Sequence, residues 1–183
     1  PTGLNNDAWA NTTEGAYAIY DDDPANAEVY GNLYNGYAVE TGNLAPDGWR
    51  VPTDNDIKQL EMYLGMSQEE ADEEGNSRGT SEGSKLAGMD DLWIDGDLED
   101  GVEFGTSGFY FLPAGYRTIN GNYLNIGDSG YFWSATENNS NNAFYRQLHY
   151  NNSHVFRIHD TKKNGFSIRF INYYDGPTWH VST

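Results

Sequence analysis

The sequence lacks cysteine altogether and has little positive charge. Without cysteine, no disulfide, no thiolate nucleophile and no Cys-ligated zinc can form. Only 10 Lys and Arg residues stand against 28 Asp and Glu residues, which gives a formal net charge of −18. Nucleic acids and anionic membrane surfaces attract basic proteins, so this balance argues against both as partners. The sequence also lacks an apolar run of about 18 residues, so we expect no membrane insertion.

The 183 residues are long enough for one domain with a real core. Only 37% of them are hydrophobic, but the aromatic content of 15% can supply buried area. No signal peptide is recognisable at the start of the sequence, and we expect the chain to be a part of a longer secreted protein.

Charge is divided unevenly along the chain. Residues 1–104 carry 24 acidic and 4 basic residues, whereas residues 105–183 carry 4 acidic and 6 basic residues. The second part also holds 17 of the 27 aromatic residues. The acidic part suits hydration and hard cations such as calcium. The aromatic part with its arginines suits the recognition of an anionic or flat ligand.

Helix signals lie early in the chain and strand signals lie late. Thr53 is a candidate N-cap with Asp56 placed to complete a capping box, and a second short helix is expected from Ser67 with Glu70 in the same role. Residues 75–91 have the composition of a loop. Short aromatic runs indicate strands over these ranges: 109–112, 131–136, 143–150, 155–159 and 166–171. This order predicts an α+β fold with one or two early helices and a later antiparallel sheet with long loops.

Three acidic segments are candidate metal sites. The strongest is Asp95-Gly96-Asp97-Leu98-Glu99-Asp100, where oxygen ligands at alternate positions around a turn could bind calcium. It is not an EF-hand, because the required glycine and the final glutamate are missing. Weaker candidates are Asp21 with Asp23, and Glu137 with Asn138. The alternative for each segment is a solvated polar loop without a metal.

The candidate ligand-binding residues are arginines among aromatic residues. Arg146 shares a strand face with Phe144 and Leu148, so it is either extended along apolar surface or held for a ligand. Trp133 is either core or binding surface. The full set is Tyr116, Arg117, Trp133, Tyr145, Arg146, Tyr150 and Arg157. We find no catalytic motif: the histidines have no metal-binding spacing, and no serine stands in a nucleophile turn.

An ordered set of motifs resembles the Fibrobacter succinogenes major paralogous domain family of bacterial surface proteins. The matching strings are YGNLYN at 30–35, APDGWRVPT at 45–53, GSKL at 83–86, LPAGYR at 112–117, YFWSATE at 131–137, FYR at 144–146 and GFSIR at 165–169. This resemblance implies a C-type-lectin-like fold, related also to formylglycine-generating enzymes. The matches run from about residue 6 to residue 171, and we take residues 1–171 as the ligand-binding domain, with residues 172–183 as a C-terminal extension or linker.

Two departures from the family pattern stand out. Ala45 and Phe170 occupy positions where the family has cysteine. The resemblance therefore implies that a family disulfide is lost at both ends together, and that another device, such as calcium, holds the fold. Oxidase relatives need reactive cysteines, so we expect this chain not to be an enzyme of that kind.

Size, acidity and the lack of cysteine make the chain similar to the calcium-dependent peptide-binding modules of large RTX adhesins from marine bacteria. This resemblance implies an extracellular, cell-surface location, calcium as cofactor and the free C-terminus of a host surface protein as partner. A calcium-dependent glycan-binding module is the alternative, with Glu137, Asn138 and Asn142 coordinating sugar hydroxyls through calcium. A hydrolase that uses loop carboxylates is a third hypothesis.

Overall fold

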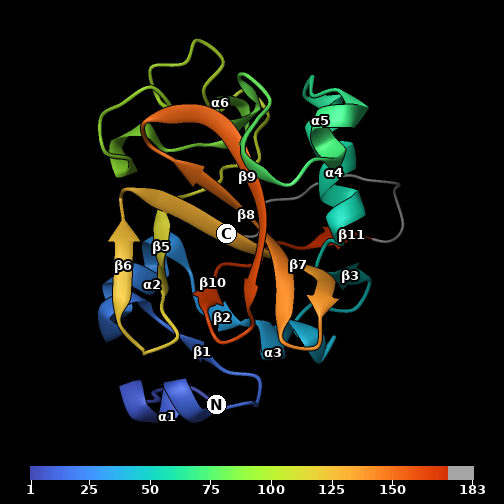
Figure 1. Ribbon diagram of the computed structural model, residues 1–183. Coiled ribbons are helices and arrows are strands. Elements are labelled where there is room, and N and C mark those ends of the chain that lie inside the picture. The colour runs from blue at the N-terminus through green and yellow to red at the C-terminus, as the bar shows by residue number, and fades with distance from the viewer. Residues whose placement is uncertain (173–183) are drawn as a thin grey trace.

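Antiparallel sheets and six short α-helices build residues 1–172, the part of the chain that the computed structural model describes (Figure 1). The mixed α+β class predicted from the sequence is therefore confirmed. The helices are α1 (Asn6–Asn11), α2 (Pro24–Tyr30), α3 (Gly36–Glu40), α4 (Asp54–Tyr63), α5 (Gln68–Asp72) and α6 (Glu82–Leu86). None of these helices has the length and apolar content needed to cross a bilayer.

The two helix starts read from the sequence are confirmed. The Thr53 side chain accepts a hydrogen bond from the Asp56 amide, and the Asp56 carboxylate accepts one from the Thr53 amide, so α4 begins with a complete capping box. Ser67 and Glu70 form the same reciprocal pair at the start of α5. The other four helices were not predicted, because each has only five to seven residues and no clear periodicity.

A four-stranded sheet with the order β4-β9-β8-β7 forms the centre of the molecule. Its strands are β4 (Gly75–Arg78), β7 (Ser129–Asn139), β8 (Asn142–His149) and β9 (Asn152–Thr161). Both faces are buried: Phe132 packs with Leu148 and α4 on one face, whereas Tyr131 packs into a second core on the other. Figure 1 shows the long orange strands crossing the middle of the fold with α4 and α5 beside them.

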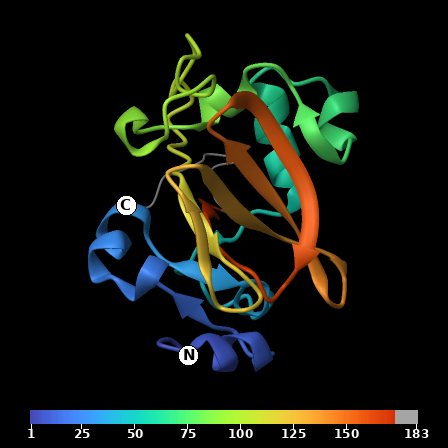
Figure 2. The ribbon, with the colours of Figure 1, turned by 60° about the vertical axis from the view of Figure 1, so that its left-hand side comes forward.

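A five-stranded sheet with the order β1-β2-β10-β5-β6 joins the two ends of the described chain. Its strands are β1 (Tyr17–Ala18), β2 (Leu33–Asn35), β5 (Ala114–Arg117), β6 (Tyr123–Ile126) and β10 (Gly165–Phe166). A third, two-stranded ladder pairs β3 (Trp49–Arg50) with β11 (Ile171–Asn172). In Figure 2 the N-terminal segments lie along the edge of the fold away from α4 and α5.

The structure corrects several predicted boundaries. No strand covers residues 109–112, where only Phe111 makes an isolated bridge with Ala87. The expected loop over 75–91 contains β4, α6 and a 3-10 turn at Asp90–Leu92. The run 166–171 is divided between β10 and β11. Of the C-terminal extension proposed for 172–183, all but the first residue lies outside the described residues.

Candidate functional site

Arg146 and Arg157, both expected to contact a ligand, lie instead in the interior, 0% and 7% exposed. They stand directly opposite each other on β8 and β9, so two like charges share one sheet face. Asp54 of α4 compensates both, with its carboxylate 2.8 Å from Arg146 Nη1 and 2.8 Å from Arg157 Nη2. The prediction that these arginines face a ligand is therefore wrong, because both guanidinium groups are already bound to acids of the chain.

Glu61 and Arg78 complete this buried charge network. Glu61 is fully buried and lies 2.6 Å from Arg146 Nε and 2.6 Å from Arg78 Nη2. Burial by itself raises the pKa of Asp54, but the hydrogen bonds and charges of Arg157 and Arg146 outweigh it and lower that pKa. Sequence reasoning missed Glu61, although it sits four residues after Ile57 on the apolar face of α4. The signal that could have found Glu61 was an acidic residue on the apolar face of a helix, where an acid is seldom placed without a partner.

Arg117 is also buried, 1% exposed, and holds the N-terminal segment in place. Its Nε donates to the Gly121 carbonyl at 3.0 Å and its Nη2 donates to the Leu4 carbonyl at 2.8 Å. The guanidinium carbon lies 4.5 Å from the ring centre of Trp9. Arg117 thus joins the β5–β6 hairpin to the start of the chain, and the expectation that it faces a ligand is wrong too.

The predicted aromatic walls are mostly core. Trp133 is 0% exposed and packs against Phe166, with the ring centres 4.3 Å apart, so the core alternative holds for it. Tyr145 is buried in the same cluster, where desolvation raises the pKa of its hydroxyl. Tyr116 packs at the edge of this cluster, and Tyr150 packs against the other core. These four rings do not gather around an open site.

The expected metal residues are not assembled into one site. Within residues 1–172, no group of three or more acidic or histidine side chains has an arrangement that could hold a metal ion. Asp23 caps α2 by accepting from the Ala25 amide at 3.0 Å. Glu137 forms an ion pair with the buried Lys162 at 2.7 Å. Asp21 and Asn138 are exposed to solvent.

The segment 95–100 forms a tight acidic loop fixed by its one apolar residue. Leu98 is fully buried, and its amide donates to the Tyr150 carbonyl at 2.9 Å. Desolvation and the neighbouring Asp95 carboxyl raise the pKa of Glu99, and Glu99 Oε2 is enclosed without a hydrogen-bond partner. Asp97 and Asp100 are exposed. Two close carboxyls with an orphaned oxygen fit a cation, but side chains of this loop alone supply too few ligands for a complete calcium site.

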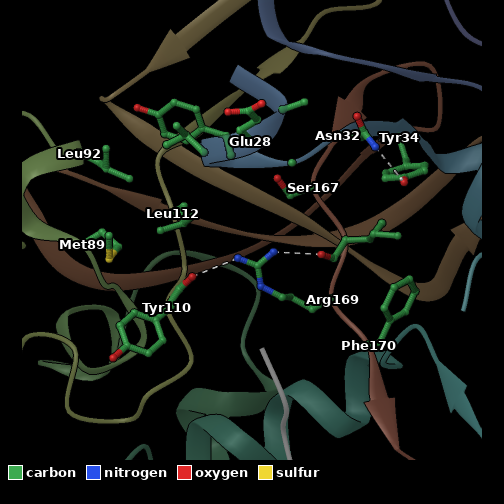
Figure 3. Close-up of a pocket in the computed structure, with 15 residues that line it drawn as sticks. Glu28, Asn32, Tyr34, Met89, Leu92, Tyr110, Leu112, Ser167, Arg169 and Phe170 are labelled. Carbon is green, nitrogen blue, oxygen red and sulfur yellow. Dashed lines mark hydrogen bonds between the residues drawn. The ribbon is translucent and has the colours of Figure 1, made fainter. Parts of the chain in front are cut away.

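A pocket of about 910 Å³ opens on another part of the surface (Figure 3). Four segments that are distant in sequence line it: α2 with the residues after it, the turn at 89–92, the segment 110–112 and the connection 167–170 between β10 and β11. Helix α2 buries none of its residues, so its pocket side is open. The apolar lining consists of Ala27, Val29, Met89, Leu92, Leu112, Ile168 and Phe170, with the rings of Tyr30, Tyr34 and Tyr110.

Arg169 is the cation of this pocket, and Figure 3 shows it in the middle of the lining residues. Its Nη1 and Nη2 donate to the carbonyls of Ile168 and Tyr110, each at 3.1 Å. Its Nε is enclosed and has no hydrogen-bond partner, and no acid within residues 1–172 forms an ion pair with it. Desolvation lowers the pKa of Arg169 to about 10, so it is charged at neutral pH.

Two residues at the rim have strained backbones. Met89 and Tyr110 have φ angles of 60° and 51°, in the left-handed region that residues with a side chain seldom adopt. Their apolar side chains are nevertheless 49% and 46% exposed. Strain of this kind costs about 1–3 kcal/mol per residue and tends to occur at ligand-binding sites.

Sequence reasoning did not include Arg169 among the candidate ligand-binding residues. The available signal was its position between Ile168 and Phe170, as an arginine that alternates with apolar residues. Its neighbours could not be found from sequence, because α2, the 89–92 turn and residues 110–112 meet only in the folded protein.

The fold and the pocket define a single α+β domain with a largely apolar pocket that carries one cation without an acidic partner among residues 1–172. Its sequence matches the family model of the Fibrobacter succinogenes major domain over residues 2–172. The chain belongs to this family. No curated protein and no solved structure gives a significant match to it.

Proposed function

We propose that this domain is a calcium-dependent ligand-binding module of a large secreted bacterial adhesin, and that it binds the free C-termini of host cell-surface proteins or peptides. The observation that carries the proposal is Arg169, a half-buried cation with an enclosed Nε and without an acidic partner among residues 1–172, set in a largely apolar pocket. A peptide C-terminus supplies a carboxylate for the guanidinium group and a side chain for the apolar walls.

The pocket has the properties of a binding site. Its volume of about 910 Å³ lies within the range that takes a drug-sized ligand, which corresponds to a few amino-acid residues. Arg169 is already fixed by two carbonyls, so little side-chain entropy is lost when an anion binds. A guanidinium group has five N–H donors and binds a carboxylate through two parallel hydrogen bonds, and the carbonyls of Ile168 and Tyr110 take only two of the donors of Arg169.

Calcium is proposed for the 95–100 loop. Asp95 and Glu99 would hold the ion there, and a bound cation would neutralise two carboxyls that now repel each other. The orphaned Glu99 Oε2 supports this placement. Asp21–Asp23 and Glu137–Asn138 give no such support, because Asp23 is engaged as a helix cap and Glu137 is engaged with Lys162.

The test compares one peptide as the free acid and as the C-terminal amide, by calorimetric titration with calcium and with EDTA. Loss of one partner of a desolvated charge pair costs roughly 2–5 kcal/mol, so the amide should bind at least tenfold more weakly. In Arg169→Gln, acid and amide should bind equally weakly. Lys58→Gln is the matched control: it removes the same charge from an ion pair on α4, and Lys58 does not line the pocket.

Equal affinity for the acid and the amide would refute C-terminal recognition. Binding only to sugars on a glycan array would make the calcium-dependent lectin-like module the function instead. Unchanged peptide binding in EDTA would show that binding does not depend on calcium, whereas the proposed peptide site would be unaffected by that result.

A further inference from the structure

The pocket carries two charges of opposite sign in different environments. Among the lining residues within 1–172, only Arg169 and Glu28 are charged. Arg169 has its Nε enclosed, whereas Glu28 is exposed on α2. The two side chains come from different segments in Figure 3 and form no ion pair with each other. The pocket therefore offers an inner positive and an outer negative contact.

The negative character extends beyond Glu28. Asp91, exposed in the turn that lines the pocket, is close enough to Tyr30 to help raise the pKa of its hydroxyl, after the larger effect of desolvation. The whole chain has a formal charge of −18, which repels anionic ligands approaching from solution. A ligand with a single carboxylate must therefore reach Arg169 through a field of the wrong sign.

The walls near the two charges are apolar. Val29 is next to Glu28 and is 46% exposed, and Leu92 and Leu112 line the pocket from two other segments. Half-exposed apolar side chains gain most from a ligand group that covers them. A polar or acidic side chain placed here would lose water without gaining a partner.

We infer that the pocket selects C-terminal peptides whose last residue has an apolar side chain and which carry a lysine or arginine about one to three residues upstream. This inference rests on the proposed function and specifies its ligand. The terminal carboxylate binds Arg169, the last side chain covers the apolar wall, and the upstream cation binds Glu28. The same cation offsets the repulsion between the acidic protein and the carboxylate.

The test uses five-residue free-acid peptides and calorimetric titration at low salt. The reference peptide has leucine at its last position and lysine two residues earlier. Replacing lysine by glutamate should weaken binding about fivefold or more, and replacing leucine by aspartate should weaken it at least tenfold. In 0.5 M salt the lysine-to-glutamate difference should fall below about twofold, because exposed charges are then screened.

Variants of the protein locate the cation contact. In Glu28→Gln the preference for lysine over glutamate should shrink by at least half, whereas the preference for the free acid over the amide should persist. Glu14→Gln is the matched control, because Glu14 is an exposed acid that does not line the pocket. It should leave both preferences unchanged.

The outcomes separate the two proposals. If the acid is preferred over the amide but lysine and glutamate peptides bind alike, the cation contact is wrong and C-terminal recognition stands. If acid and amide bind alike while Glu28 still decides between lysine and glutamate, C-terminal recognition is wrong and the cation contact stands. Absence of binding by every peptide overturns both.

Discussion

Replacing Glu61 by glutamine tests whether the buried charge network holds α4 on the central sheet. Glu61 is fully buried and is bonded to Arg78 and Arg146, which are 2% and 0% exposed. Glutamine keeps the size and one acceptor but removes the charge, so three buried arginines are left with Asp54 as their only acid in the network. Breaking a buried ion pair by removing one partner costs about 3–5 kcal/mol.

That cost is a large part of the stability of the whole domain, which is typically about 5–15 kcal/mol. For a protein of this size it corresponds to a fall of roughly 6–20 °C in the melting midpoint. Urea unfolding of the wild type and the variant at pH 7 measures the change directly. Glu69→Gln is the control, because Glu69 is an exposed acid of α5 and its loss should change stability by less than about 0.5 kcal/mol. Equal midpoints for the two variants would refute the role given to the network.

Three further changes should have measurable effects. The lowered pKa of Asp54 contributes stability that is fully present above the ordinary pKa of an aspartate and is lost as the pH falls through the lower pKa of the folded state. Urea unfolding midpoints should therefore fall steeply below about pH 4. Midpoints that stay constant from pH 5 to 3 would contradict this. Calcium at about 100 times its Kd should stabilise the domain by roughly 2.7 kcal/mol relative to EDTA. The stabilisation should be smaller in Glu99→Gln and at acidic pH, because the raised pKa of Glu99 lets a proton take the place of the cation. Identical melting midpoints with calcium and with EDTA would exclude structural calcium. Arg169→Met should stabilise the fold by roughly 0.5–2 kcal/mol in urea unfolding while it weakens peptide binding, and a loss of stability would show that Arg169 is a structural residue.

The sequence predicted those elements of the fold that have a local signature. Capping boxes mark the starts of α4 and α5, and alternation with turn residues marks β7, β8 and β9. Strands of two to four residues, such as β1 and β10, carry no local pattern and exist because a partner strand lies beside them. Their pairing is set by tertiary packing, which a single sequence does not contain.

The site was harder to predict for an electrostatic reason. Arginines with aromatic neighbours look the same in sequence whether a ligand or an acid of the chain compensates them. The acid that compensates Arg146 and Arg157 is Asp54 of α4, which precedes Arg146 by 92 residues. Arg169 differs from these two because the fold places no acidic side chain of residues 1–172 beside it. Acidic loops were equally ambiguous, because a carboxylate can cap a helix, as Asp23 does, or pair with a lysine, as Glu137 does.

The disulfide that the family resemblance implies, and that this chain cannot form, has a candidate substitute in strand pairing. Ala45 and Phe170 stand close in sequence to β3 and β11, whose ladder pairs Arg50 with Ile171. The pairing of β3 with β11 thus joins the two chain segments that the disulfide implied by the family resemblance would connect covalently. Because hydrogen bonds can open where a disulfide cannot, this junction depends on the packing around it.

The pairing of β2 with β10 and of β3 with β11 also has a kinetic consequence. Gly165 pairs with Asn35, so a loop of more than two thirds of the chain must close before β2 gains its partner β10 in the five-stranded sheet. Closing a loop of that length costs roughly 4 kcal/mol of chain entropy before any contact repays it. Domains dominated by such distant pairings fold in milliseconds to seconds. We therefore expect β1 and β2 to pair with each other early, and β2 and β3 to gain their partners β10 and β11 only after nearly all of the domain has been made.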